Sequence, residues 1–143
     1  MSDRVCLGLD YGGRRVGIAL GYQDLSLARP LKTILYSSEQ ELFERIALEV
    51  KEWNPTRFVV GLPKYEDHKP HPIARKIIKF CELLESRFGL EVVCVDESFT
   101  SVEAERLIVK KNISREKKKE LLDMLSAQLI LQDFFSSNVE TGA

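Results

Sequence analysis

The first part of the chain carries three short apolar runs separated by turn residues. Residues 5–9 are apolar and end at Asp10, and after a turn with two glycines the apolar run 16–20 follows. Two such runs joined by glycines predict a β-hairpin with an aspartate at its mouth. A third strand is predicted for residues 31–36, after the breaker Arg29-Pro30, and it would complete an antiparallel meander.

The middle of the chain alternates between helical periodicity and buried strands. Apolar residues recur at helical spacing over residues 42–53 and again over residues 73–88. The runs 58–62 and 92–95 are short and almost wholly apolar, which is typical of strands covered on both faces. We therefore expect a helix, a buried strand, a second helix and a second buried strand.

Capping residues mark the ends of these helices and predict two more. Ser38 has capping-box spacing before the first helix, and Gly89 supplies a left-handed cap after the second. Thr100 has the same spacing and predicts a helix to about Lys111, while Ser114 can cap a final helix. We expect the apolar stripe of that final helix to consist of Leu121, Leu122, Leu125, Leu129 and Phe135.

The predicted order of elements is three strands followed by helix, strand, helix, strand and two helices. A meander followed by right-handed crossovers predicts an α/β fold, with a five-stranded mixed sheet of antiparallel and parallel strands flanked by helices. This arrangement fits an RNase H-like fold. We expect residues 1–138 to form a single domain and residues 139–143 to form a frayed C-terminal tail.

Composition supports a globular domain and says little about partners. The chain has 143 residues, 44% of them hydrophobic and 30% charged, which is enough to bury a core without disulfides. The net charge is −1, so any affinity for nucleic acid has to come from local patches. With no signal-like leader and no run of about 20 apolar residues, we expect a cytoplasmic protein with no membrane partner. Cys6, Cys81 and Cys94 lie in apolar runs without metal-site spacing and are expected to be reduced core residues.

Acidic residues follow the first and the last predicted strands. Asp10 ends one and Asp96-Glu97 ends the other, and the carboxyl ends of neighbouring parallel strands converge. Asp123 on the final helix could supply a third carboxylate from the side. Clustered carboxylates repel one another unless a cation neutralises them, and such oxygen ligands suit Mg²⁺ or Mn²⁺. One or two ions would activate water and steady the leaving oxygen in phosphodiester hydrolysis.

Each acid also has a simpler interpretation. Asp10 could be a turn residue, although the glycines after it leave room for backbone and substrate to approach closely. Asp96-Glu97 could be solvated loop residues, and an acid on a charged helix, such as Asp123, usually faces solvent. The small residues Ser126-Ala127, one turn after Asp123, suit close approach to the sheet.

Basic residues gather around the same predicted turns and loops. They could frame one phosphate track, or they could be scattered solubilising charge. The denser basic run 110–119 is interrupted by acids, so it is as consistent with a solvated helix junction as with backbone binding. The candidate nucleic-acid-binding residues are Arg14, Arg15, Lys64, Lys69, Arg75 and Lys76.

Four segments spread over nearly the whole chain form a combined signature. They are residues 10–19 (DYGGRRVGIA), 60–63 (VGLP), 96–104 (DESFTSVEA) and 123–127 (DMLSA). In this order and spacing they resemble the YqgF family, also called RuvX or Holliday-junction-resolvase-like proteins. The resemblance implies an RNase H-like fold, divalent-metal nuclease chemistry and a link to maturation of the 5′ end of pre-16S ribosomal RNA, with junction resolution as an alternative.

The same resemblance implies site residues and partners. By it, Asp10, Glu97 and Asp123 are catalytic and bind Mg²⁺ or Mn²⁺, with Asp96 beside them as a further ligand. The substrate would be structured RNA such as pre-rRNA, or branched DNA. Ribosomal particles are further candidate partners, and the protein would be a monomer or a homodimer.

This sequence departs from the family pattern where substrate would be handled. Ser98 stands where the family usually has arginine, which removes a bidentate phosphate donor. Residues 64–68 and His71 replace a glycine-containing loop, and Met124-Leu125 replace small residues. The loop histidines, His68 and His71, are more consistent with a phosphate contact or no special role than with a metal site.

Two other functions are compatible with the sequence. The departures would also suit a non-cleaving nucleic-acid-binding factor in ribosome assembly or transcription. An aspartate hairpin of this kind also binds nucleotide phosphates in actin-like kinases and ATPases. Those enzymes clamp the nucleotide between two lobes, and 143 residues supply only one.

Overall fold

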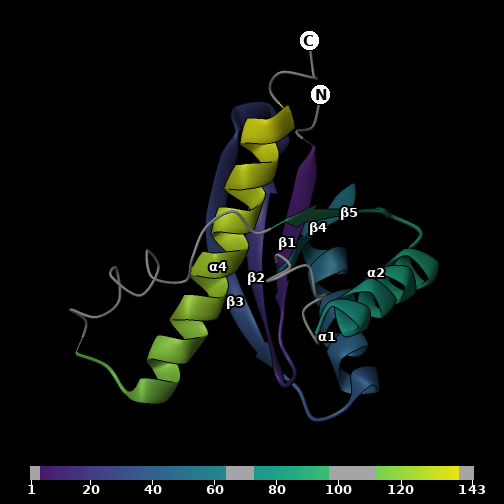
Figure 1. Ribbon diagram of the computed structural model, residues 1–143. Helices are drawn as coiled ribbons and strands as arrows, with labels where there is room; N and C mark the ends of the chain where they lie inside the picture. The colour runs from purple at the N-terminus through teal and green to yellow at the C-terminus, as the bar shows by residue number, and fades with distance from the viewer. Residues whose placement is uncertain (1–3, 64–72, 97–111, 139–143) are drawn as a thin grey trace, which may run out of the picture.

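A five-stranded mixed sheet forms the centre of the molecule. The computed structural model describes residues 4–63, 73–96 and 112–138 (Figure 1). The strand order is β3-β2-β1-β4-β5, with β1, β2 and β3 antiparallel and β4 and β5 parallel to β1. This confirms the predicted meander and crossovers. The strands are β1 (Val5–Tyr11), β2 (Arg15–Tyr22), β3 (Leu27–Leu35), β4 (Arg57–Leu62) and β5 (Glu91–Asp96).

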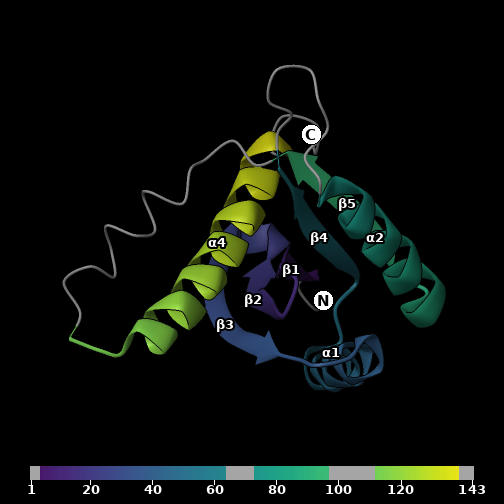
Figure 2. The same ribbon diagram turned by 60° about the horizontal axis from the view of Figure 1, so that its bottom comes forward.

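Helices cover both faces of the sheet. Figure 2 shows α1 and α2 on one face and α4 on the other. The described residues also include a short 3₁₀ helix, η1 (Gln23–Leu25), and none of the helices they form is both long and apolar enough to cross a membrane. The helix predicted for residues 100–111 lies outside the described residues. The helices are α1 (Glu39–Trp53), α2 (Ala74–Phe88) and α4 (Arg115–Asn138).

Predicted caps set the ends of α1 and α2. The Ser38 hydroxyl accepts a hydrogen bond from the Glu41 N–H at 3.1 Å, as a capping residue does. Asn54 ends α1 in the left-handed conformation, and its N–H donates to the Val50 carbonyl at 2.8 Å. Gly89 ends α2 in the same conformation, with φ 65°, which glycine adopts without strain.

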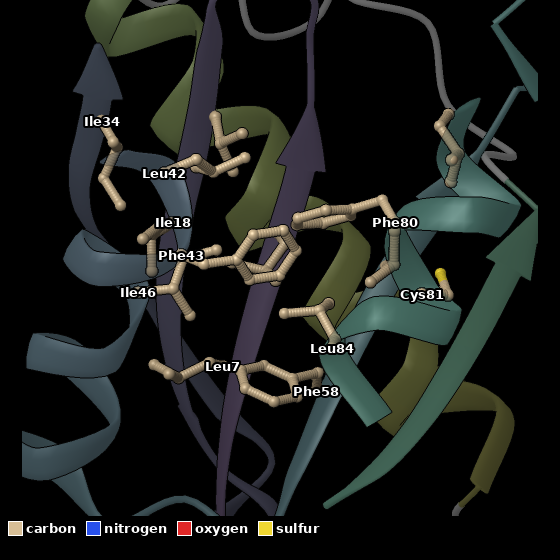
Figure 3. Close-up of a cluster of buried hydrophobic side chains, with 14 of the residues drawn as sticks. Leu7, Ile18, Ile34, Leu42, Phe43, Ile46, Phe58, Phe80, Cys81 and Leu84 are labelled. Carbon is tan, nitrogen blue, oxygen red and sulfur yellow. The ribbon is translucent and has the colours of Figure 1, made fainter. Parts of the chain in front are cut away.

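Two hydrophobic cores hold the layers together. The larger core lies between the sheet and helices α1 and α2, where strand side chains meet helix side chains (Figure 3). The smaller core lies between the sheet and α4. Alternate residues of β1 therefore belong to opposite cores, since successive strand side chains face opposite ways. Side chains that Figure 3 labels in the larger core include Leu7, Ile18, Leu42, Phe43, Phe80 and Leu84.

The third strand begins earlier than the sequence predicted. We expected residues 31–36, but β3 begins at Leu27 and runs through Pro30. Proline is tolerated because β3 is an edge strand, where a missing N–H leaves no ladder partner unsatisfied. The register shifts between Ile18 and Ala19 of β2, which absorbs an extra residue beside the proline.

The buried face of α4 also differs from the predicted stripe. Phe135 is buried, whereas the four predicted leucines, Leu121, Leu122, Leu125 and Leu129, are only half-buried. The prediction was wrong for these four leucines because apolar residues lie around much of the helix, so their spacing alone does not show which side packs on the sheet. The buried residues of α4 are Ser126, Ala127, Ile130, Leu131, Phe134 and Phe135.

Candidate active site

Asp10 faces the α4 side of the sheet. Its neighbours at odd positions, Leu7 and Leu9, belong to the core under α1 and α2, whereas Cys6 belongs to the core under α4. By the alternation of β1, Asp10 shares the face of Cys6. Its Cα pairs with that of Gly17 on β2, so a glycine lies beside it on the same face.

A stripe of three glycines lets α4 approach this face. A Cβ atom added at Gly17 would overlap the backbone carbonyl of Asp123. A Cβ at Gly8 would lie 2.9 Å from the Ala127 carbonyl oxygen, and one at Gly21 would lie 2.7 Å from the Phe135 ring. The space beside Asp10 that the sequence assigned partly to substrate is thus filled at Gly17 by the α4 backbone.

Two hydrogen bonds fix the position of α4 along the edge strand. The Thr33 hydroxyl donates to the Glu120 carbonyl at 2.6 Å, and the Gln128 amide donates to the Ala28 carbonyl at 2.9 Å. Asp123 lies between these two anchors on α4. The glycines therefore set the height of Asp123 above the sheet, and these two side-chain-to-backbone hydrogen bonds set its position along it.

Asp10 and Asp123 line the same cavity of about 240 Å³. The rest of its wall comes from the β1–β2 turn, residues 11–15. The Gly12 N–H donates to the Arg15 carbonyl at 2.8 Å, and glycine is favoured there because an added Cβ would lie 2.8 Å from the same oxygen. The structure thus brings together two of the predicted acids. We call this space the Asp10 cavity.

Arg15 forms an ion pair with Asp123 inside this cavity. Its Nε atom lies 2.7 Å from Oδ2 of Asp123, whose side chain is only 18% exposed. Burial raises the pKa of Asp123, and the Arg15 guanidinium acts in the opposite direction. Arg15, predicted to bind nucleic acid, is therefore engaged with an acid, whereas Arg14 is exposed.

The structure describes one of the two acids predicted at the end of β5, Asp96. Asp96 pairs with Leu62 of β4, which packs in the core under α1 and α2. Val93 and Val95 pack in the core under α4. By this alternation Asp96 belongs to the α2 face of the sheet, opposite to Asp10. Glu97 lies outside the described residues.

The donor set of the cavity suits a hard cation. Two carboxylates beside an open space can supply oxygen ligands to Mg²⁺ or Mn²⁺ and leave room for water or phosphate oxygens, and a cation would offset the burial cost at Asp123. Within the described ranges no three acid, cysteine or histidine side chains cluster closely enough to hold a metal. A third protein ligand would therefore have to come from outside those ranges or be replaced by water.

A second hollow of about 230 Å³ lies across the β1–β2 turn and shares Tyr11 and Gly13 with the Asp10 cavity. The Tyr36 hydroxyl donates to the Gly12 carbonyl at 2.7 Å and supports the turn. We call this space the lysine hollow. The sequence did not point to Tyr11 or Tyr36 as lining residues, since a tyrosine at a strand end carries no specific signal. Its lining includes Tyr11, Tyr36, Phe43, Lys76, Lys79 and Phe80.

Of the remaining predicted basic residues, two lie in α2 and two lie outside the described residues. Arg75 and Lys76 are exposed in the first turn of α2. Lys64 and Lys69 lie outside the described residues, as do His68 and His71. Arg14 and Arg15 therefore line the Asp10 cavity on one side of the turn, and Lys76 lines the lysine hollow on the other.

Sequence comparison identifies the family. The profile of RuvX, described as Holliday junction resolvase, matches residues 4–137. The chain belongs to the RuvX family. A RuvX relative from Methylobacillus flagellatus, named "Putative pre-16S rRNA nuclease", is 42% identical over 135 residues, which cover 94% of this chain and 92% of that protein. A relative of the same name from Nitrosospira multiformis is 36% identical over 135 residues, covering 94% and 89%.

Solved structures share the fold of this RuvX protein. T. thermophilus RuvC in complex with Holliday junction substrate has a TM-score of 0.58 at 17% identity, with 96% of this chain and 97% of that chain covered. The fowlpox virus Holliday junction resolvase has a TM-score of 0.55 at 14% identity, with 93% and 99% covered. The predicted RNase H-like fold is thereby confirmed, in its RuvC-like form.

Proposed function

We propose that this RuvX protein is a metal-dependent nuclease that hydrolyses phosphodiester bonds in structured RNA, at the 5′ end of pre-16S rRNA. The observation that carries the proposal is the convergence of Asp10 and Asp123 in one cavity at the carboxyl end of β1. The names of the relatives support the RNA substrate. Branched DNA is the second substrate to be compared, since the family profile is described by junction resolution.

Asp10, Glu97 and Asp123 are the ligands and catalytic acids of this proposal. Bound there, one or two Mg²⁺ or Mn²⁺ ions would activate a water for attack and stabilise the leaving oxygen. Asp10 would supply carboxylate oxygens from a strand and Asp123 from a helix. Because both elements are packed in the fold, the two carboxylates are held at a fixed separation. We leave Asp96 out of the ligand set because its strand position assigns it to the α2 face.

Substrate binding in this proposal uses the cations on both sides of the β1–β2 turn. Arg14 would contact a phosphate at the Asp10 cavity, and Arg15 would do so once a cation replaces it at Asp123. Lys76, which lines the lysine hollow, and the exposed Arg75 beside it would contact the backbone beyond the turn. Lys64 and Lys69 remain candidates from the sequence. Phosphate contacts of this kind position a backbone without reading its sequence, so specificity would rest on RNA shape.

The test is cleavage of a 5′-extended 16S rRNA precursor and of a four-way DNA junction. With Mg²⁺ or Mn²⁺ we expect RNA cleavage that EDTA abolishes. We expect Asp10→Asn and Asp123→Asn each to lower the rate at least about 100-fold, because each removes charge that holds the ion.

Asp24→Asn is the matched control, because Asp24 pairs with Arg4 at the opposite end of β1. It should cleave at the wild-type rate. Metal-independent cleavage, or an unchanged rate in Asp10→Asn, would contradict the proposal. Faster cleavage of the DNA junction than of the RNA would reassign the substrate.

One observation favours a second candidate, a non-cleaving RNA-binding factor. Arg15 already neutralises Asp123 at 2.7 Å, so the cavity can be balanced in part without a cation. Under this alternative, salt-sensitive RNA binding would be equal in wild type and Asp10→Asn, with no turnover in either. Cleavage by the wild type would exclude it.

A further inference from the structure

Two cysteines meet on the face of the sheet opposite the Asp10 cavity. Cys81 comes from α2 and Cys94 from β5, and their Sγ atoms are 3.2 Å apart. Cys81 is buried at the margin of the larger core, where Figure 3 labels it, whereas Cys94 is exposed on the edge strand. One thiol of the pair is thus accessible to solvent and the other is covered.

The distance is short enough for a covalent bond to form with little movement. A disulfide is about 2.05 Å long, so the sulfurs would have to approach by roughly 1.2 Å. Rotation of the exposed Cys94 side chain can supply part of this, because an exposed side chain is free of the core packing that restrains Cys81. The sequence alone did not indicate the pair, since its members are 13 residues apart without a recognisable motif.

We propose that Cys81 and Cys94 form a reversible, peroxide-sensitive disulfide that joins α2 to the edge strand β5. The proposal is independent of the nuclease function, because it concerns the opposite face of the sheet and needs no substrate.

The chemistry proceeds in two balanced steps. The Cys94 thiolate attacks one oxygen of hydrogen peroxide, the O–O bond breaks, and the second oxygen leaves as water after protonation, which gives a sulfenic acid. The Cys81 sulfur then attacks the Cys94 sulfur, the S–O bond breaks, and the hydroxyl leaves as a second water with the Cys81 proton. Two thiols are oxidised, one peroxide is reduced, and two waters form.

Exposure supports Cys94 as the attacking residue. Peroxide in solution can reach the exposed Cys94 sulfur, whereas the Cys81 sulfur is buried. A metal site is a weaker use of the pair, since no third acid, cysteine or histidine joins them among the residues that the structure describes.

Cys6 provides an internal control. It is fully buried in the core under α4, on the other face of the sheet, and burial raises its pKa to about 11. A buried, protonated thiol reacts slowly with peroxide. We therefore expect Cys6 to remain reduced while the other two are oxidised.

Intact mass and peptide mapping test the proposal. Folded protein is treated with a small excess of hydrogen peroxide, then alkylated under denaturing conditions and digested with trypsin. We expect a loss of two hydrogens, one alkylated thiol in place of three, and a cross-link between the peptides 80–87 and 88–106, which carry Cys81 and Cys94. Dithiothreitol should restore three thiols. The oxidised form should melt roughly 5–10 °C higher, because the cross-link restricts the unfolded chain.

Variants separate a specific disulfide from general oxidation. Cys6→Ala should form the same cross-link, while Cys94→Ser and Cys81→Ser should not. Because Cys94 is exposed, Cys94→Ser keeps the test valid even if Cys81→Ser does not fold. Sulfinic acid at Cys94 without a cross-link, a cross-link between two chains, or three unreacted thiols would each overturn the proposal.

Discussion

Arg15 and Asp123 form a short, half-buried ion pair that joins the start of β2 to α4. The pair has opposing effects on Asp123, since burial raises the pKa of its carboxyl and Arg15 lowers it, with burial the larger. A carboxyl whose pKa is raised by folding stabilises the native state at low pH. That contribution is lost as the pH rises through its folded pKa, because the unfolded state then holds fewer protons than the native state.

Replacing Arg15 should therefore weaken the protein most at neutral pH. In Arg15→Gln the pKa of Asp123 rises further, and the native state carries a half-buried carboxylate without its guanidinium. We expect the free energy of unfolding to fall by about 1–2 kcal/mol at pH 7 and by less as the pH falls through the Asp123 pKa. Urea unfolding at a series of pH values measures this difference.

The matched control for this prediction is Arg14→Gln. Arg14 is the exposed neighbour of Arg15, and its replacement by glutamine changes the net charge by the same amount. Its unfolding free energy should stay within about 0.5 kcal/mol of wild type at every pH. Equal losses in the two variants, or a loss in Arg15→Gln that does not vary with pH, would show that Arg15 does not act through Asp123.

At the scale of elements, the distance between α4 and the sheet decides whether Asp123 can reach Asp10. That distance is set by the glycines under the helix. Gly17 leaves no room for a Cβ beside the Asp123 backbone, whereas an added Cβ at Gly13 in the neighbouring turn meets nothing within 4 Å. Neither glycine has a positive φ among the described backbone angles, so the two positions differ in available space rather than in strain.

Gly17→Ala and Gly13→Ala form a paired test of this arrangement. We expect Gly17→Ala to destabilise the protein by about 1–3 kcal/mol or more, because the methyl group must push α4 away from the sheet. Gly13→Ala should be neutral or slightly stabilising, since it restricts only the unfolded chain. Thermal unfolding measures both, and equal destabilisation by the two substitutions would contradict a specific role for the close approach of α4.

The elements themselves were largely predictable, and the exceptions have local causes. Caps at Ser38 and Gly89 and the turn after Asp10 are encoded by adjacent residues, so pattern alone located them. The start of β3 and the buried face of α4 depend on which strand lies at the sheet edge and how closely a helix packs. Those are properties of the assembled sheet. They cannot be derived from a segment read alone.

The same division holds for the candidate site. The meeting of Asp10 and Asp123 was expected from strand ends and the small residues of the last helix. The Arg15–Asp123 pair was not, because it depends on the height of α4 above the sheet, which no local pattern encodes. The placement of Asp96 on the α2 face follows from register, which a one-residue shift would reverse.

At the scale of the whole molecule, a net charge of −1 means that nucleic acid is attracted by the arrangement of cations rather than by their number. The described cations next to the β1–β2 turn lie at the carboxyl end of β1. Lys51 is exposed in the last turn of α1, which leads into the amino end of β4, at the opposite end of the sheet. Substitutions of a cation at each end of the sheet therefore test where RNA binds.

Salt dependence of RNA binding measures the number of phosphate contacts. Each contact contributes about 0.7–0.9 to the slope of log affinity against log salt concentration. If the backbone passes the Asp10 cavity, Arg14→Gln should lower the slope by about one contact, and Lys51→Gln, which removes the same charge, should leave it unchanged. Titrations of fluorescent pre-rRNA in Ca²⁺ buffer, chosen to suppress turnover, would give both slopes. Equal reductions would mean that binding follows overall charge, and a reduction in Lys51→Gln alone would place the RNA at the other end of the sheet.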